Sequence, residues 1–467
     1  MHLRDKKLSG WSTLWFILAA VLFFHLAYTV DYCPVLILGF LYCLFRLTQV
    51  RTTRHAFYIG LGIGLAIYAP QLSFFWNIFQ VGAIPLWLVL SFWLALFLLL
   101  GRVCLERFGL IGWACAAPFV WTGLEYFRSE LYYLRFSWLI PGYVFSGSFG
   151  LHYLACYGVY GIGFVLMAIA VYLTVFKGLG QRTRALAGIV LTFVLLYPLA
   201  AQSSQSSSQP SLRVTGVQLE VPGAGDTVLA LSRAIDKFPD TDLFVLSEYT
   251  FTGPVPDLVK KWCRKHRKYL VVGAEDPSPP SQYYNTAFVI GTNGEVVFRQ
   301  VKCVPVQFTK DGLPAPVQDL WNSPWGKLGF GICYDASYTR VTDELIRQGA
   351  QGLIFPTMDN QDWGARQHQL HARIAPMRAA EYVVPVFRLC SSGISQFVDP
   401  TGRVLESAPF PGQGAIMSAQ MQLVTRGRMP PDRWLPRFSV GFIGLLIVWL
   451  GVDRLRRRSK TPTPLAS

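Results

Sequence analysis

Three segments of the sequence end in side chains that could cooperate in nucleophilic catalysis. The segment "LFVLSE" ends at Glu248, "VVFRQVK" ends at Lys302, and "KLGFGIC" ends at Cys333. A cysteine becomes a strong nucleophile when its thiol loses a proton. A nearby carboxylate could accept that proton, while an ammonium stabilises the thiolate and the oxyanion of a tetrahedral intermediate. These residue types suit covalent acyl chemistry in which Glu248 is the base, with a backbone N–H just after Cys333 as a second oxyanion donor.

Each of the three residues also has a purely structural explanation. A cysteine at the end of an apolar strand is commonly a small buried hydrophobic residue. Lys and Glu at strand ends are commonly solvated. The histidines of the same region, His266, His368 and His371, stand in polar helical stretches and show no pairing with a cysteine in the sequence.

The three segments belong to a region of alternating strands and helices, residues 212–430. Short β-rich runs such as "LRVTGVQL", "DLFVLSE" and "GLIFPT" alternate with helical stretches such as "DTVLALSRAIDKF" and "TDELIRQG". This alternation predicts a layered α/β domain. In such folds sites gather where strands run out into loops, so Glu248, Lys302 and Cys333 could meet in one pocket.

The chain as a whole is too apolar for an ordinary soluble protein. Of its 467 residues 52% are hydrophobic and only 15% are charged, which implies a membrane portion. A transmembrane helix needs about 20 mostly apolar residues. Seven candidate spans precede residue 202 and one follows the α/β region, near residues 11–30, 32–48, 56–76, 84–101, 109–127, 150–176, 185–201 and 437–452.

The basic residues predict the orientation of these spans, because Arg and Lys concentrate in cytoplasmic loops. With the N-terminus inside, the basic residues of the predicted loops and tail all lie on the cytoplasmic side. They are Arg46, Arg51, Arg54, Arg102, Arg107, Lys177, Arg182, Arg184 and the tail "RLRRRSK". The α/β domain then lies outside the cytoplasmic membrane, which in a bacterial cell is the periplasmic side. The formal net charge of +15 therefore indicates topology, and we expect no nucleic-acid partner.

We expect four parts in this multi-pass chain. Residues 1–201 form a seven-span membrane domain, 202–211 a flexible Ser/Gln-rich linker, and 212–430 the catalytic domain. Residues 431–467 form a closing span and a basic cytoplasmic tail. The nine cysteines show no CxxC or Cys/His ligand spacing, so we expect no metal site and no cofactor.

Two further segments allow two interpretations each. The basic stretch "KKWCRKHRK", residues 260–268, is typical of a solvated helix face but could also meet anionic headgroups. Apolar residues in the loop between Lys302 and Cys333 could touch lipid or pack the domain, and we favour packing. These loop residues are Phe308, Leu313, Leu320, Trp321 and Trp325.

The motifs around the three residues resemble the carbon-nitrogen hydrolase (nitrilase) superfamily. The similar segments are "FRQVKCVP", "GICYD", "PTMDNQDW" and "MRAAEYVVPVFRLCSSGIS", and the resemblance covers the whole α/β domain. It implies an α-β-β-α sandwich with Glu248, Lys302 and Cys333 as the catalytic residues. It further implies oxyanion or supporting roles for Tyr334, Asp335, Asn360 and Trp363.

Together with the membrane spans, the chain is similar to the apolipoprotein N-acyltransferases of bacterial inner membranes. That resemblance implies that Cys333 takes an acyl group from a phospholipid as a thioester. The acyl group then passes to the N-terminal amine of a diacylglyceryl-modified lipoprotein, so the implied partners are the phospholipid donor, this acceptor and the membrane. A pocket near the outer leaflet would avoid lifting acyl chains into water, at about 0.8 kcal/mol per methylene.

Two departures from the family pattern favour an alternative. The family has a Pro-Phe-Gly-Glu run after the lysine, whereas "KCVPVQFTKDG" has Gln307 and Phe308 there. We therefore expect the supporting carboxylate to be missing, with Gln307 as the residue that could take its place. The pair Tyr334–Asp335 is typical of soluble amidases of the superfamily. The alternative is a membrane-anchored amidase or nitrilase in which water resolves the thioester, and a non-catalytic scaffold is a second competitor.

Overall fold

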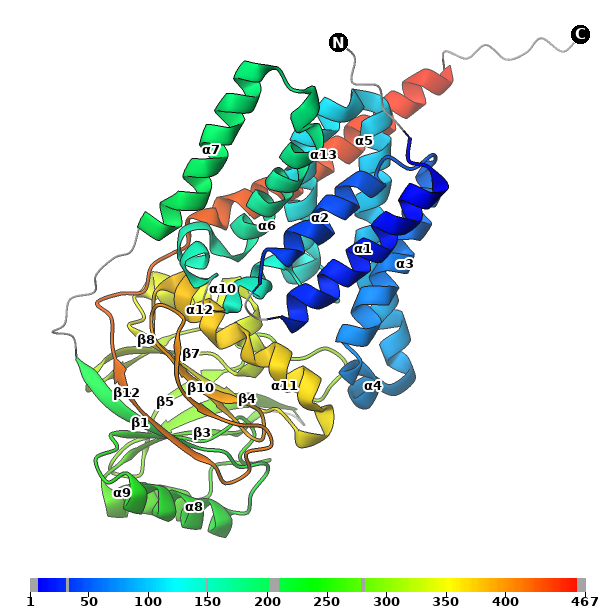
Figure 1. The fold of residues 1–467 in the computed structure, drawn as a ribbon. Helices are drawn as coiled ribbons and strands as arrows, with labels where there is room; N and C mark the ends of the chain where they lie inside the picture. Colours follow the sequence, from blue (N-terminus) through cyan, green and yellow to red (C-terminus); the bar gives the residue numbers. More distant parts are fainter. Residues whose placement is uncertain (1–6, 31–32, 148–149, 201–209, 279–281, 460–467) are drawn as a thin grey trace, which may run out of the picture.

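The computed structural model describes residues 7–30, 33–147, 150–200, 210–278 and 282–459. It has a helical part and a part built on two β-sheets, and these lie one above the other (Figure 1). The linker predicted at residues 202–211 and the end of the basic tail lie largely outside the described residues.

Apolar helices make up the first part (Figure 1). They are α1 (Gly10–Thr29), α2 (Leu36–Leu47), α3 (Thr53–Gln71), α4 (Phe74–Phe79), α5 (Ala83–Tyr126), α6 (Leu151–Val175), α7 (Gln181–Ala200) and α13 (Leu435–Ser459). Within the described ranges, four helical stretches are long and apolar enough to cross a membrane. These are Gly10–Thr29, Phe74–Leu131, Leu151–Gly178 and Pro431–Arg457. The predicted spans at 84–101 and 109–127 both fall in the second stretch, and the eight-span topology stays a prediction.

Helix α5 folds back on itself at Gly109. This residue has φ 69° and ψ −179°, a conformation open to glycine because it lacks a Cβ atom. The rings of Phe97 and Trp121 have their centroids 5.2 Å apart, whereas 24 residues of straight helix would separate them by about 36 Å. The two arms of α5 therefore pack against each other as a helical hairpin.

Two six-stranded sheets form the second part. Their strand orders are β12-β1-β2-β3-β4-β5 and β11-β10-β9-β8-β7-β6. The central strands β1–β2–β3 and β7–β8–β9 are parallel, and the flanking pairs are antiparallel. The strands are β1 (Ser211–Val217), β2 (Leu243–Val245), β3 (Tyr269–Ser278), β4 (Gln282–Ile290), β5 (Val296–Val301), β6 (Leu320–Ser323), β7 (Gly326–Phe330), β8 (Gly352–Thr357), β9 (Val386–Cys390), β10 (Ser395–Val398), β11 (Val404–Ala408) and β12 (Ile416–Gln422).

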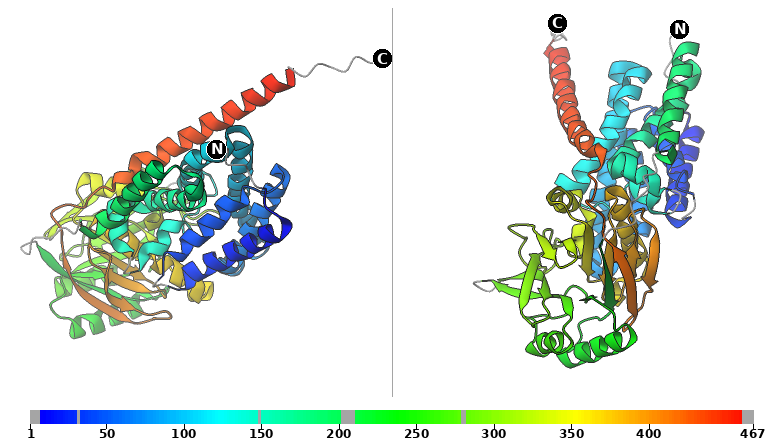
Figure 2. Two further views of the ribbon diagram at one scale, coloured as in Figure 1. Left: turned by 45° about the horizontal axis from the view of Figure 1, so that its top comes forward. Right: turned by 90° about the vertical axis from the view of Figure 1, so that its left-hand side faces the viewer.

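Helices cover both outer faces of the paired sheets (Figures 1 and 2). Helices α8 (Ala224–Lys237) and α9 (Asp257–His266) lie on the first sheet. Helices α10 (Thr339–Gln348), α11 (Ala365–Ala372) and α12 (Ile374–Tyr382) lie on the side of the second sheet that faces the apolar helices. This is the predicted α-β-β-α sandwich. The basic helix α9 lies on the side away from the apolar helices (Figure 1), which contradicts its interpretation as a headgroup-binding surface.

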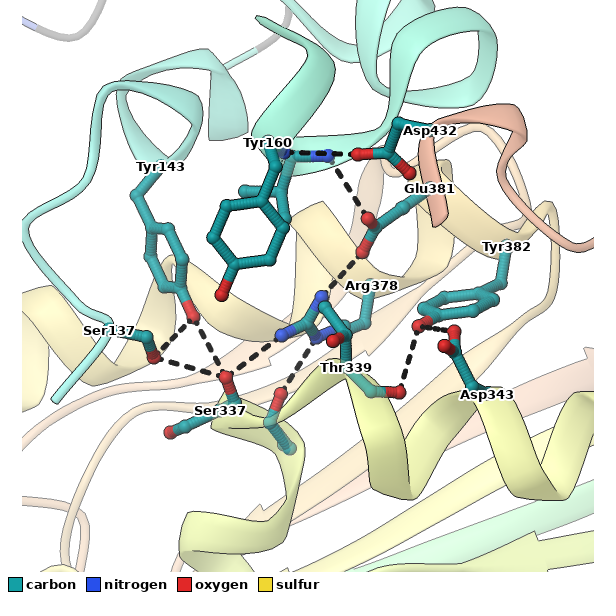
Figure 3. A network of polar contacts seen from close by, with 12 residues as sticks. Ser137, Tyr143, Tyr160, Ser337, Thr339, Asp343, Arg378, Glu381, Tyr382 and Asp432 are labelled. Atoms are coloured by element: carbon teal, nitrogen blue, oxygen red, sulfur yellow. Dashed lines mark hydrogen bonds and ion pairs between the residues drawn. The ribbon is translucent and has the colours of Figure 1, made fainter. Parts of the chain in front are cut away.

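A buried polar network joins the two parts beside the turn Cys333–Ser337 (Figure 3). The carbonyl oxygen of Ser337 accepts hydrogen bonds from Arg378 of α12 at 2.9 Å and from Ser137 at 3.0 Å. Trp138 donates its indole N–H to the Ser337 hydroxyl at 2.9 Å. The turn that carries Cys333 is therefore held both by the sandwich and by the segment that links α5 to α6.

A break in α6 extends this network. Gly158 has φ 68°, so the helix restarts there and exposes backbone N–H groups that need acceptors. Glu381 accepts from the N–H of Val159 at 3.0 Å, and Asp432 accepts from the N–H of Tyr160 at 3.1 Å (Figure 3). Carboxylates at a helix N-terminus are electrostatically favourable. These bonds link α6, α12 and the turn Pro431–Trp434 that precedes α13.

Candidate active site

Cys333 begins a tight turn and is the third residue after the end of strand β7. Its φ of 50° lies in the left-handed region, which is uncommon for a residue with a side chain and is found at many functional sites. The carboxylate of Asp335 accepts the N–H of Cys303 at 3.1 Å and that of Val304 at 2.7 Å. Asp335 thus ties the nucleophile turn to the segment that follows Lys302. Burial raises the pKa of Asp335 to about 6, against the effect of these backbone N–H groups.

The fold brings Glu248, Lys302 and Cys333 into one buried cluster. Lys302 Nζ lies 2.8 Å from Glu248 Oε1. The Cys333 thiol is 3.6 Å from the carbonyl oxygen of Met358, and the N–H of Met358 donates to Glu248 Oε2 at 2.8 Å. The exposed fractions of the three residues are 2%, 1% and 6%. The ends of β2, β5 and β7 therefore meet at one place, which is the geometry that the strand-end argument requires.

A second carboxylate, Asp311, completes the cluster. Its Oδ2 atom lies 2.6 Å from Lys302 Nζ. Its Oδ1 atom accepts hydrogen bonds from Asn285 Nδ2 at 2.8 Å and from the Tyr249 hydroxyl at 3.1 Å. Asn285 also donates to Glu248 at 2.6 Å. The two carboxylates thus share the same ammonium and the same amide.

Asp311 shows that the expectation of a missing carboxylate was wrong. Phe308 and Gly312 both have left-handed backbone angles, with φ 66° and 75°. The loop after Lys302 therefore turns back, and Asp311 reaches the ammonium from a position later in the sequence. Gln307 instead donates its amide to the carbonyl of Tyr133 at 3.1 Å and does not replace the carboxylate.

The charges of the cluster keep Cys333 protonated at rest and make Glu248 a stronger base than an ordinary glutamate. Burial raises the pKa of Cys333 well above its ordinary value, and the Glu248 carboxylate raises it further against the effect of Lys302. Burial also raises the pKa of Glu248. Burial alone would lower the pKa of Lys302, but Asp311 and Glu248 together hold it well above its usual range. The resting site therefore holds a thiol, an ammonium and a carboxylate of raised basicity.

The cluster lies at the polar end of a cavity between the sandwich and the apolar helices. Its volume is about 250 Å³, far more than the roughly 30 Å³ occupied by one water. Aromatic and aliphatic side chains of α4 and α5 form much of its wall, including Phe74, Phe75, Ile78, Phe79, Leu86 and Leu90. The cavity therefore connects Cys333 directly to the apolar part of the molecule.

The other predicted residues take different positions around the cavity. Tyr334 and Trp363 line it, and the Tyr334 hydroxyl donates to the carbonyl of Arg135 at 3.2 Å. The side-chain oxygen of Asn360 is buried and has no hydrogen-bond partner within the described part of the chain, and this residue is not part of the cavity wall. Phe308 lines the cavity; its side chain is 67% exposed, and its ring centroid lies 6.4 Å from that of Phe79. The packing role that we favoured for Phe308 is therefore wrong.

Two other residues of this loop, Trp321 and Trp325, pack inside the domain, and the cysteines form no disulfides. The Trp321 and Trp325 rings pack on Tyr269, with centroids 5.6 Å and 5.3 Å apart, as the packing interpretation expects. All nine cysteines are free thiols. Sequence reasoning missed Asp311 together with two buried residues of the cavity wall, Gln367 and His371.

The comparisons with known proteins agree with this architecture. Residues 222–430 match the model of the carbon-nitrogen hydrolase family, and residues 12–172 match that of the apolipoprotein N-acyltransferase N-terminal domain. An apolipoprotein N-acyltransferase of Nitrosomonas europaea is 26% identical over 479 residues, which cover 92% of this chain and 94% of the relative. That of Geobacter metallireducens is 25% identical, covering 80% and 82%. The omega-amidase NIT2-B of Xenopus laevis is 23% identical and covers 44% of this chain and 79% of its own.

The sandwich and its Glu–Lys–Cys cluster define a carbon-nitrogen hydrolase domain, here joined to a bundle of apolar helices. The match to the amidase covers less than half of this chain, whereas the matches to the acyltransferases cover most of it. The chain belongs to the apolipoprotein N-acyltransferase family. It is accordingly an acyltransferase of the bacterial inner membrane.

Proposed function

We propose that this enzyme moves a fatty acyl chain from a phospholipid to the N-terminal amine of a diacylglyceryl-modified apolipoprotein, through a thioester on Cys333. The observation that carries the proposal is the cavity that joins the Cys333 thiol to the apolar wall of α4 and α5. An acyl chain can lie along this wall without being exposed to water, because each buried methylene contributes about 0.8 kcal/mol. A soluble amide substrate would gain little from such a wall.

In the first half-reaction, Glu248 accepts the thiol proton while the sulfur of Cys333 bonds to the ester carbonyl carbon. The ammonium of Lys302 and the N–H of Tyr334 stabilise the oxyanion. The C–O bond to the glycerol then breaks, and Glu248 gives its proton to the departing alkoxide. The products are a lysophospholipid and an acyl thioester.

Asp311 keeps the ammonium paired during this cycle. When Glu248 takes up a proton its attraction for Lys302 falls, but the carboxylate of Asp311 remains 2.6 Å away. Lys302 therefore stays charged and in place while Glu248 alternates between its two protonation states. A single carboxylate could not act as the base and as the permanent counter-ion at once.

In the second half-reaction, the acceptor amine attacks the thioester carbonyl. A C–N bond forms, the amine proton passes to Glu248, and the C–S bond breaks. The thiolate of Cys333 then recovers the proton. Water must be excluded while the thioester exists, and the apolar wall of the cavity suits that requirement.

We also propose that the chain crosses the membrane eight times, with the sandwich on the periplasmic side. The basic residues of the predicted inner loops support this orientation. Arg107 pairs with Asp453 of α13 at 3.2 Å, and the far end of α13 lies at the end of the bundle remote from the sheets (Figure 1). Single cysteines introduced into loops of the protein test this orientation when intact cells are labelled. Cys115, which is exposed, is replaced beforehand. A membrane-impermeant maleimide should label the sandwich and should leave the loop at Gly109 unlabelled.

The proposed transfer is tested with a phospholipid carrying a labelled acyl chain. Wild-type protein and C263S, which changes a buried cysteine of α9, should acquire label that hydroxylamine removes, and C333A should acquire none. A diacylated lipopeptide should then take the label from the wild-type protein. Absence of the thioester would contradict the proposal, and release of the label only as free acid would support the hydrolase alternative.

A further inference from the structure

Two polar residues of the cavity wall are not used by this mechanism. His371 and Gln367 stand one turn apart on α11, line the cavity, and are exposed by only 1% and 2%. His371 Nε2 and Gln367 Oε1 are buried and make no hydrogen bond to any described residue. Buried polar atoms without a partner are unfavourable, so two of them side by side in a cavity wall indicate that a ligand completes them.

Asp359 determines which atoms of the two residues stay free. Its Oδ1 atom lies 2.7 Å from His371 Nδ1 and accepts from Gln367 Nε2 at 2.9 Å, while Arg388 donates to Oδ2 at 2.7 Å. Burial alone would raise the pKa of Asp359, but His371 and Arg388 hold that pKa well below its usual value. An ionised carboxylate can only accept hydrogen bonds, so His371 carries its proton on Nδ1 and Gln367 turns its NH₂ group toward Asp359.

Both free atoms are therefore hydrogen-bond acceptors. Burial lowers the pKa of His371 to about 4, against the opposing effect of Asp359, so the ring is neutral at neutral pH and Nε2 presents a lone pair. The indole of Trp138 stacks on the ring at 4.7 Å between centroids and fixes its plane. The free atom of Gln367 is its amide oxygen, which also only accepts.

The acceptor pair is connected to the nucleophile through two consecutive residues. Asp359 follows Met358, whose carbonyl oxygen lies 3.6 Å from the Cys333 thiol. The same cavity holds Cys333, His371 and Gln367. A substrate group that reaches the two acceptors therefore lies in the same cavity as the thioester on Cys333.

We propose that His371 and Gln367 form a subsite for the attacking α-amino group, whose N–H groups they bind so that its lone pair faces the thioester on Cys333. The inference rests on the proposed transfer to an amine. The ester of the acyl donor offers no N–H to these atoms, and neither does the alkoxide that leaves. A neutral primary amine has two N–H groups, one for each acceptor before attack. After the C–N bond forms, one of these protons passes to Glu248. His371 and Gln367 are thus positioning residues of the second half-reaction.

The two half-reactions separate this role from a structural one. H371F keeps a ring against Trp138 and removes the lone pair, and Q367L removes the other acceptor without changing that stack. Each should form the labelled thioester at a rate within about twofold of wild type, yet transfer it to a diacylated lipopeptide about tenfold more slowly or worse. Release of the label by dithiothreitol, a nucleophile without N–H groups, should be unchanged. H371Q restores an acceptor and should recover much of the transfer rate.

His368 provides the matched control. It is buried on the same helix, lies 3.9 Å from Asp359 and stacks on Phe410, but it is not part of the cavity wall. H368F should keep the wild-type ratio of transfer to thioester formation. Equal losses in both half-reactions of H371F and Q367L, or no loss of transfer in either, would overturn the subsite. The proposed function is judged separately, by thioester formation and transfer in the wild-type protein. A donor whose headgroup lacks N–H groups, such as phosphatidylglycerol, should give the same pattern, and a defect confined to phosphatidylethanolamine would assign the subsite to the donor headgroup instead.

Discussion

The carboxylate of Asp311 lies 2.6 Å from the ammonium of Lys302, slightly closer than the carboxylate of Glu248 at 2.8 Å. Lys302 therefore has a permanent counter-ion that is distinct from the base. Without Asp311, the ammonium would hold Glu248 as its only partner and lower its basicity. In the proposed mechanism, the ability of Glu248 to take the thiol proton thus depends on Asp311, a residue that does not touch the substrate.

We expect D311N to slow thioester formation by about 100-fold, since it weakens both the base and the placement of the oxyanion-stabilising ammonium. Thioester formation from labelled phospholipid measures this directly. D319N is the matched control, because Asp319 is exposed in the same loop and its replacement should change the rate less than twofold. A D311N enzyme of wild-type rate would contradict the role assigned to the second carboxylate.

The pH dependence of the first half-reaction should report the raised pKa of Glu248. Because the base acts as a carboxylate, kcat/KM should fall as the pH drops through this pKa, at a higher pH than the value of about 4.3 for an ordinary glutamate would give. The Asp311 charge is one of the groups that raise the pKa of Glu248. D311N should therefore shift the acid limb of the residual activity toward lower pH, and an upward shift would be inconsistent with the arrangement.

The proximity of the three proposed catalytic residues was predictable because each stands at the end of an apolar, strand-like run of the sequence. The ends of such strands meet in a layered sheet, so Glu248, Lys302 and Cys333 could be placed together without coordinates. Asp311 could not be placed, because it lies in a loop without periodicity. Its position depends on the left-handed backbone at Phe308 and Gly312, which the sequence does not reveal at a phenylalanine.

The subsite on α11 was beyond sequence reasoning for a different reason. Nothing in "QHQLH" distinguishes His371, which lines the cavity, from His368, which does not. The difference arises from the docking of α11 against Asp359 and Trp138. The apolar spans were easier, since length and composition indicate them. The predicted span 56–76, however, includes only the first half of the short helix α4 that lines the cavity.

Filling the apolar end of the cavity should select against long acyl chains. Leu90 of α5 is buried and lines the cavity, so L90W should slow acylation of Cys333 by a long-chain phospholipid about tenfold. Acylation by a short-chain ester should change little, because its chain does not reach α5. Leu88 of the same helix is 39% exposed and lies outside the cavity wall, so L88W should leave both rates near wild type. Equal losses with both chain lengths in L90W would argue against the chain lying along this wall.

Ionisation of the buried Asp335 should lower the free energy of unfolding as the pH rises from 4 to 6. Burial raises the pKa of Asp335 to about 6, against about 3.9 for an unfolded aspartate. Between these values the folded state binds more protons than the unfolded state, so the free energy of unfolding decreases with increasing pH. The two-unit difference corresponds to a loss of about 3 kcal/mol across the window.

D335N lacks this titration and isolates its contribution. The difference in free energy of unfolding between wild type and D335N, measured in detergent across pH 4 to 7, should move against the wild type as the pH rises and level off above about pH 7. Any loss from replacing the carboxylate that binds the N–H groups of Cys303 and Val304 is constant across the series and does not affect the slope. A difference that is flat, or that moves in favour of the wild type, would show that the ionised carboxylate is fully compensated by those N–H groups.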